Sequence, residues 1–196
     1  VSSDGNRIYW TEQESTPLYL REAGQTYLVS ERESDSSAQE AILWGTSSDG
    51  GSAFLTSEAK LTEDASPTGT DLYLYDANAK ELTDLTPDAT DAGGAGVSKV
   101  LGVSEDGAYA YFIATGNLAA GAEGSKPKIY AWHEGTTRLV GELATNAVQL
   151  TLSKTSSEQW RVSPDGHYLG FLFGGRIEGP QPQESWPFRQ AYLYSY

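Results

Sequence analysis

The chain has 196 residues and a formal net charge of −14, from 13 basic and 27 acidic residues. This balance disfavours nucleic acid and anionic membranes as partners, because both are recognised through clustered lysines and arginines. The absence of cysteine excludes disulfides, thiolate nucleophiles and zinc–cysteine sites, and no segment approaches the roughly 20 apolar residues of a membrane span. The 12 tyrosines, 5 tryptophans and 21 glycines favour strands and turns.

A Ser-x-Asp-Gly turn occurs four times and marks the start of four similar units. The successive aspartates are 45, 57 and 59 residues apart, and the turns lie at residues 2–5, 47–50, 104–107 and 163–166. A repeat of roughly 40–50 residues is typical of propellers and solenoids. Each unit alone is too small to bury its own faces, so we expect a single domain over residues 1–196.

The first two units predict seven strands. The first unit predicts three strands, at residues 6–10, 18–21 and 26–30. The second predicts a complete antiparallel meander of four strands, at residues 41–46, 52–56, 71–76 and 81–85. An Asp-Gly turn joins the first two strands of this meander, as in a tight hairpin.

The third and fourth units predict seven more strands. The third unit is the clearest, with strands at residues 100–104, 108–114, 128–133 and 137–143. Residues 128–133 alternate between polar and apolar positions, as a half-buried strand does. The fourth unit predicts strands at residues 159–162, 167–173 and 191–196.

These elements predict an all-β, propeller-like array of four-stranded antiparallel blades. The four repeats span approximately residues 1–38, 39–97, 98–158 and 159–196. The first repeat lacks most of its first strand and the fourth lacks its last, so we expect both end blades to be incomplete. Three arrangements stay open: one blade mixed from both termini, a part of a larger propeller, or a homodimer that completes a ring.

The units resemble the TolB-type propeller repeat, a relative of the WD-repeat blade. That pattern is an apolar strand, S-x-D-G, an aromatic strand, and later strands of the "lyLyd" and "l-T-x-L" kinds. Ser163 to Phe171 is similar to its first half, and Asp71–Asp76 with Leu82–Thr86 is similar to its second. The resemblance covers nearly the whole chain and implies the fold. It also implies a bacterial protein of the periplasm or the extracellular space, because TolB-type propellers serve in exported assemblies.

No motif in the chain predicts catalysis. The sequence has no G-x-S-x-G elbow and no phosphate-binding glycine loop, and its four turns lack the residue between Asp and Gly that a sialidase-type Asp-box has. The only histidines, His133 and His167, occupy positions typical of surface residues near the short turns. We therefore expect no catalytic residue, no metal site and no cofactor, while calcium binding by the acidic loops stays open.

Six long segments alternate with the short turns, and in a four-stranded blade they share one end. They are residues 31–39, 58–70, 87–96, 115–126, 144–158 and 174–187. Long loops at one end of a rigid scaffold are where binding residues usually lie. Arg176 and Trp186 are residue types that anchor interfaces, and Glu63 and Asp64 form an acidic pair in another of these loops, so these four are the predicted partner-binding residues.

The sequence therefore predicts a non-catalytic binding or scaffold module that recognises a protein or peptide through its long-loop face. Two alternatives stay open. The chain could be the accessory propeller of a prolyl-oligopeptidase-like hydrolase, which carries such a domain beside a catalytic one. It could also be a carbohydrate-binding or glycoside-hydrolase propeller, which would place aromatic and carboxylate side chains together in a pocket.

Overall fold

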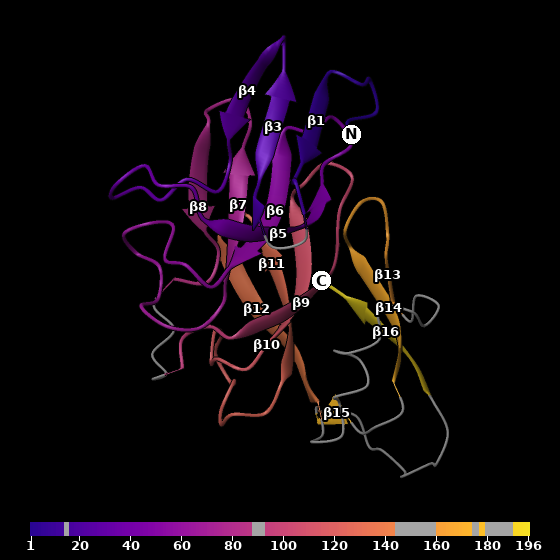
Figure 1. Cartoon of the computed structure of the whole chain (residues 1–196). Coiled ribbons are helices and arrows are strands. Elements are labelled where there is room, and N and C mark those ends of the chain that lie inside the picture. Colours follow the sequence, from indigo (N-terminus) through magenta and orange to yellow (C-terminus); the bar gives the residue numbers. More distant parts are fainter. Residues whose placement is uncertain (14–15, 88–92, 144–159, 174–176, 179–189) are drawn as a thin grey trace.

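The computed structural model describes residues 1–13, 16–87, 93–143, 160–173, 177–178 and 190–196. These residues form four antiparallel sheets and no helix, with one sheet for each repeat (Figure 1). We call the sheets blades 1 to 4 in chain order. The predicted all-β array of antiparallel blades is confirmed, and the described parts of blades 1 and 4 have three strands each, as expected for incomplete end blades.

The strands follow the predicted order closely. Blade 1 contains β1 (Arg7–Trp10), β3 (Tyr19–Glu22) and β4 (Gln25–Leu28). Blade 2 contains β5 (Glu40–Thr46), β6 (Ser52–Ser57), β7 (Asp71–Asp76) and β8 (Glu81–Asp84). Blade 3 contains β9 (Val97–Val103), β10 (Tyr109–Ala114), β11 (Lys128–His133) and β12 (Thr136–Leu143). Blade 4 contains β13 (Trp160–Val162), β14 (Tyr168–Phe173) and β16 (Gln190–Ser195).

Two strands of two residues were not predicted. β2 (Thr16–Pro17) lies in the segment between β1 and β3, yet it pairs with the first strand of blade 2. β15 (Ile177–Glu178) lies between β14 and β16, yet it pairs with the last strand of blade 3. Each therefore extends a neighbouring blade at its edge.

The middle blades are buried on both faces, which explains their nearly continuous apolar strands. Along β10, Tyr109, Tyr111 and Ile113 pack towards blade 4, whereas Ala110 and Phe112 pack towards blade 2. β6 does the same, since Leu55 faces blade 1 and Phe54 faces blade 3. Three hydrophobic clusters thus join blades 1 and 2, blades 2 and 3, and blades 3 and 4.

The Ser-x-Asp-Gly turns repeat one set of hydrogen bonds in every blade. In blade 3, the Ser104 hydroxyl donates to Asp106 Oδ1 at 2.5 Å, and the Ala108 amide donates to the same oxygen at 2.9 Å. The Tyr109 amide in turn donates to Ser104 Oγ at 2.9 Å. Equivalent bonds occur in the other three turns. The aspartate therefore fixes the local turn, as the sequence indicates for a turn residue.

The same turns are also joined to one another by backbone hydrogen bonds. The Ser3 amide donates to the Ser48 carbonyl at 2.7 Å, and the Ser48 amide donates to the Glu105 carbonyl at 2.7 Å. The Glu105 amide then donates to the Pro164 carbonyl at 2.8 Å. We call this set the turn relay. Pro164 has no amide hydrogen, so the relay has no donor at its fourth member.

The opposite ends of the blades differ in character, and we call them the short-turn end and the long-loop end. The short-turn end also holds two-residue hairpins with positive φ at both positions, at Ala23-Gly24 and Glu134-Gly135, as type I′ turns require. His133 precedes the second of these hairpins, and its ring stacks on Tyr109 with a centroid distance of 3.9 Å. This end is therefore closed by repeated turns and packed rings.

Candidate functional site

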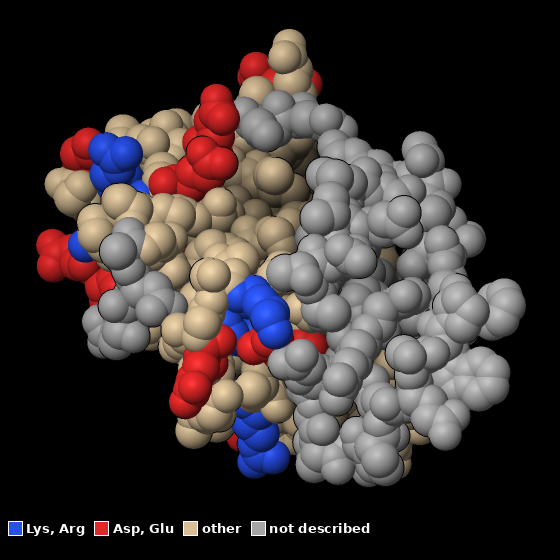
Figure 2. All heavy atoms as spheres, turned by 90° about the horizontal axis from the view of Figure 1, so that it is seen from below, with Lys and Arg blue, Asp and Glu red and all other residues tan. Residues whose placement is uncertain are grey.

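A hollow of about 620 Å³ opens at the long-loop end between the first strands of blades 2 and 3. Its walls come from β5, from the end of β6 with the residues that follow it, and from the start of β9. Figure 2 views the molecule from below and shows a recess in its upper part, with acidic side chains beside it. The volume is in the range of pockets that bind small molecules or side chains, roughly 300–1,000 Å³.

Hydrogen bonds hold the walls of this hollow in place. The Trp44 indole Nε1 donates to Thr56 Oγ1 at 2.9 Å, which fixes the orientation of the ring between β5 and β6. The buried Ser57 hydroxyl donates to the Glu40 carbonyl at 2.6 Å and accepts from the Ala59 amide at 3.1 Å. The aromatic wall and the corner that follows β6 are therefore positioned before any ligand arrives.

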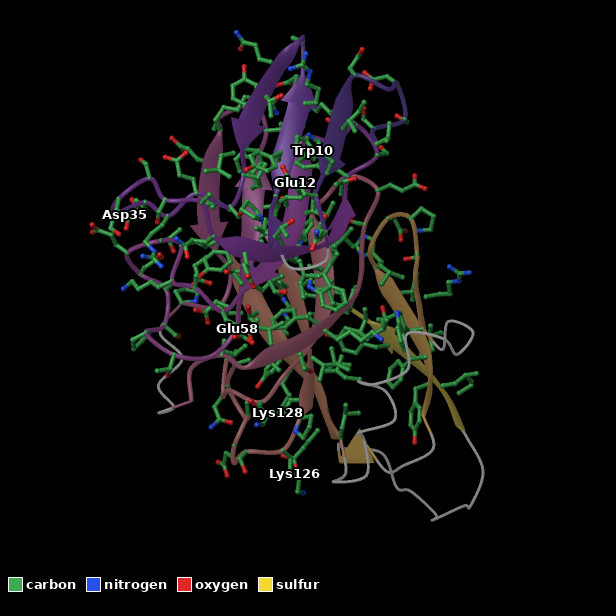
Figure 3. The ribbon with its side chains drawn as sticks, in the orientation of Figure 1. Trp10, Glu12, Asp35, Glu58, Lys126 and Lys128 are labelled. Carbon is green, nitrogen blue, oxygen red and sulfur yellow. The ribbon has the colours of Figure 1, made fainter. Side chains whose placement is uncertain are left out.

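The lining is partly apolar and partly acidic. Ile42 is 46% exposed in the hollow, and Trp44 is half-buried beside it. The side chains of Glu40 and Glu58 are exposed and also line it. Figure 3 shows Glu58 below the sheets of the first two blades, on the side away from the short turns. The hollow thus brings an aromatic ring and two carboxylates together.

A smaller hollow of about 250 Å³ lies among the loops of blades 1 and 2 and contains one of the predicted site residues. Its lining includes Glu63 together with two basic side chains, Arg32 and Lys60. The Glu63 amide donates to the Glu33 carboxylate at 2.8 Å, which joins the two loops. Asp64 follows Glu63 and is also exposed. Neither residue lines the larger hollow.

Two charged residue types are buried at the long-loop end of blades 2 and 3. Asp71 and Lys128 are the first residues of β7 and β11, so they occupy equivalent positions in blades 2 and 3. Lys128 is fully buried, and its Nζ donates to the carbonyls of Thr115 at 3.0 Å, Gly124 at 2.9 Å and Lys126 at 3.0 Å. One ammonium group therefore binds three carbonyls of the loop that connects β10 to β11 and stabilises the conformation of that loop.

Asp71 places an acidic group at the position in blade 2 that Lys128 occupies in blade 3. Asp71 is 1% exposed, and among the described residues its Oδ1 has no hydrogen-bond partner, although the backbone amides of Ser66 and Ala95, from two different long loops, lie close enough to influence its pKa. Burial, followed by the negative charge of nearby Asp84, raises the pKa of Asp71 to about 7, and the backbone amides of Ser66 and Ala95 oppose this shift. This carboxyl group is therefore held where it ionises near neutral pH.

The close approach of these two loops depends on glycine. Gly69 and Gly94 both have positive φ, and a Cβ on Gly94 would lie 1.8 Å from the Thr68 carbonyl oxygen. A Cβ on Gly69 would lie 2.4 Å from the Gly93 carbonyl oxygen. Only a residue without a side chain fits at either crossing, so the long-loop end of blade 2 has a defined backbone.

The predicted site residues are brought together only in part. Glu63 and Asp64 lie side by side on the loop that follows β6, whereas Arg176 and Trp186 lie outside the described residues. Sequence reasoning missed Trp44, Glu40 and Glu58. A signal was available for two of them, since Glu40, Ile42 and Trp44 are spaced two residues apart, as side chains on one face of a strand are.

The described residues contain no group of three or more His, Asp or Glu side chains placed to hold a metal ion. Within the same residues, no helix has the length and apolarity of a membrane-crossing segment. The buried polar network of Asp71 and Asp84 contains two carboxyl groups and belongs to the loop scaffold.

No protein-family model matches the sequence, and no curated protein matches it either. Among solved structures, the fold is similar to the crystal structure of TolB from Acinetobacter baumannii, with a TM-score of 0.49 and 14% sequence identity. The aligned region covers 99% of this chain and 39% of the TolB chain, so this chain spans about two fifths of that protein's length. This likeness concerns the fold alone.

Proposed function

We propose that the chain is a non-catalytic binding module that recognises a protein or peptide at its long-loop end. The observation that carries this proposal is the 620 Å³ hollow between blades 2 and 3, whose walls are fixed by internal hydrogen bonds. A preorganised hollow lowers the entropic cost of binding, because its side chains are already ordered. Its lining of exposed Ile42, Trp44 and flanking polar groups suits a side chain presented by a partner.

The proposal extends to the setting of the protein. The TolB-type repeats support a place in the periplasm or outside the cell of a bacterium, because propellers of this type serve in exported assemblies. The partner in that setting would be a protein or an extended peptide segment. Loops 58–70 and 93–96, which cross at Gly69 and Gly94, would form the rest of the contact surface beside the hollow.

Selection of random dodecapeptides displayed on phage against the purified chain tests this function. The affinity of the best peptide would then be measured by fluorescence anisotropy on the wild type and on Ile42→Ser. We expect Ile42→Ser to weaken binding about tenfold, which corresponds to about 1.4 kcal/mol. Ile8→Ser is the matched control, because Ile8 is 41% exposed on β1 and does not line the hollow. Equal effects of the two variants, or peptides that bind the short-turn end, would contradict the proposal.

A carbohydrate-binding role is a second candidate, because Trp44 and two carboxylates meet in one concave site. Sugars stack on tryptophan rings and donate hydroxyl hydrogen bonds to carboxylates. A glycan array probed with the wild type and with Trp44→Phe separates this role from peptide binding. A glycan signal that Trp44→Phe reduces would favour it, and a blank array would remove it.

A further inference from the structure

We propose that the hollow between blades 2 and 3 receives the basic side chain, lysine or arginine, of a bound peptide. This inference rests on the proposed function and names the chemistry of the partner at one site. The described lining contains two acidic side chains, Glu40 and Glu58, and no lysine, arginine or histidine. A positively charged group would therefore meet only attractive charges from the lining, within a chain whose net charge is −14.

The two glutamates are available for such a contact. Neither carboxylate takes part in an ion pair with any other side chain in the described part of the chain. They approach the hollow from different strands, because Glu40 begins β5 and Glu58 follows β6. A cationic group between them would interact with both, and two contacts at once are stronger than one exposed ion pair.

The aromatic wall provides the second half of the recognition. The hydrogen bond from Nε1 to Thr56 holds the Trp44 ring by its edge, and Ile42 and Val97 line the hollow as well. Cations bind favourably over tryptophan faces, and the methylene stems of lysine and arginine pack on apolar surface. The chain itself uses this pairing, with Lys99 Nζ 4.1 Å from the centroid of Trp160 and the Arg138 guanidinium 4.2 Å from that of Tyr196.

The smaller hollow in the loops of blades 1 and 2 serves as an internal comparison. It also contains a glutamate, Glu63, but Arg32 and Lys60 line it as well. An incoming cation would be repelled there by two like charges. The larger hollow is therefore the better site for a basic side chain, because its own lining is acidic, whereas the net charge of the whole chain does not distinguish the two hollows.

Titrations with three small probes test this inference directly. Nα-acetyl-lysine amide and Nα-acetyl-arginine amide carry the basic side chain, and Nα-acetyl-norleucine amide has a similar length without the charge. We would follow the indole N–H resonance of Trp44 in ¹H–¹⁵N spectra, assigned with Trp44→Phe. We expect saturable shifts with the lysine and arginine probes, at least fivefold weaker binding of norleucine, and weaker binding of both basic probes at 500 mM than at 50 mM salt.

Two double variants localise the effect. Glu40→Gln with Glu58→Gln should weaken the lysine probe at least fivefold, whereas Glu81→Gln with Glu134→Gln, two exposed glutamates at the short-turn end, should leave it unchanged. Equal shifts with norleucine, loss through the Glu81 and Glu134 variant alone, or a response to neutral sugars instead of lysine would overturn the inference. A selected peptide that keeps its affinity after its basic residues become norleucine would sink this inference and leave peptide binding intact. If the lysine probe binds but no peptide can be selected, peptide recognition as the proposed function would fail, and the site for a basic side chain would stand.

Discussion

At the short-turn end, all four blades repeat the same hydrogen bonds, whereas at the long-loop end blades 2 and 3 place opposite charges at one equivalent position. The repeated Ser-x-Asp-Gly turn depends on short-range bonds within six residues. Lys128 instead binds three backbone carbonyls of one long loop, whereas Asp71 is buried where two long loops meet and its Oδ1 has no hydrogen-bond partner among the described residues. This fold therefore has a constant end built from local hydrogen bonds and a variable end where single acidic or basic residues are buried.

Replacement of Lys128 by Met should have the largest effect, because it removes the ammonium from three backbone carbonyls. We expect the free energy of unfolding to fall by about 3 kcal/mol or more, the range for a buried charged partner that is removed. Urea unfolding measures this. Lys126→Met is the control, because Lys126 forms a partly exposed ion pair with Glu142 at 2.7 Å and should cost less than about 1 kcal/mol. Similar losses in both variants would mean that Lys128 does not hold the loop.

Substitution of Gly166 by Ala should break the constant end between blades 3 and 4. Gly166 has a φ of +75°, and an added Cβ would lie 2.6 Å from the Cβ of Tyr109. We expect a loss of about 2–4 kcal/mol from the clash and the backbone strain together. Gly135→Ala has a similar φ of +81° with open space around it, so it should show the backbone cost alone, about 1 kcal/mol. Thermal unfolding compares the two, and equal melting temperatures would contradict the tight packing.

The Asp71→Asn variant should change how the free energy of unfolding depends on pH. The pKa of Asp71 is about 7 in the folded chain and near 4 in the unfolded chain. Between about pH 4 and about pH 7 the carboxyl group is therefore protonated in the folded chain and ionised in the unfolded chain. The stability of the wild type should therefore fall as the pH rises from about 4 to about 7. An asparagine side chain cannot ionise, so the variant should lose this dependence and be more stable at pH 8 by about 1–3 kcal/mol.

Urea unfolding at pH 5, 6, 7 and 8 checks this prediction for Asp71. The exposed Glu81 on β8 provides the control variant, Glu81→Gln, which should keep the pH dependence of the wild type. If the difference between wild type and Asp71→Asn does not change with pH, the carboxyl group does not ionise in this range.

The smallest effect is expected for the turn aspartate of blade 3. The hydrogen bond from Ser104, followed by that from the Ala108 amide, lowers the pKa of Asp106 below its usual range. Its contribution should therefore be present at neutral pH and disappear as the pH falls below about 4. Asp106→Ala should cost about 1 kcal/mol at pH 7, and Asp106→Asn should cost less because the amide oxygen still accepts both bonds. Equal stability of the alanine and asparagine variants at pH 7 would show that the turn does not need this acceptor.

Much of the fold could be predicted from the sequence because its determinants are local. The Asp-Gly turns and the apolar strands around them predict β5 to β12 to within a few residues of their observed bounds. β2 could not be predicted, because Thr16-Pro17 becomes a strand only through its pairing with Ala41 and Glu40 of the next blade. β15 depends in the same way on the last strand of blade 3.

Less of the candidate site could be predicted. Charged residues at strand starts, such as Asp71 and Lys128, give the expectation of exposed side chains, and their burial depends on loops that fold over them. The hollow combines residues near positions 40, 57, 70 and 97, and only the packing of blade 2 on blade 3 brings them together. Glu63 and Asp64 are exposed as predicted for loop residues, and their role in binding stays a prediction.

The turn relay makes the four repeats unequal in a way that their similar sequences conceal. In each of the first three turns a backbone amide donates a hydrogen bond to a carbonyl of the next turn, so the relay has one direction. It ends at Pro164, which accepts a hydrogen bond and has no amide hydrogen to donate. A second copy of the third repeat, inserted directly after the first, would continue the relay, because its turn has both the donor and the acceptor. A copy of the fourth repeat placed earlier would interrupt the relay, because the proline at this position cannot donate to the next turn. The four repeats are therefore not interchangeable in order.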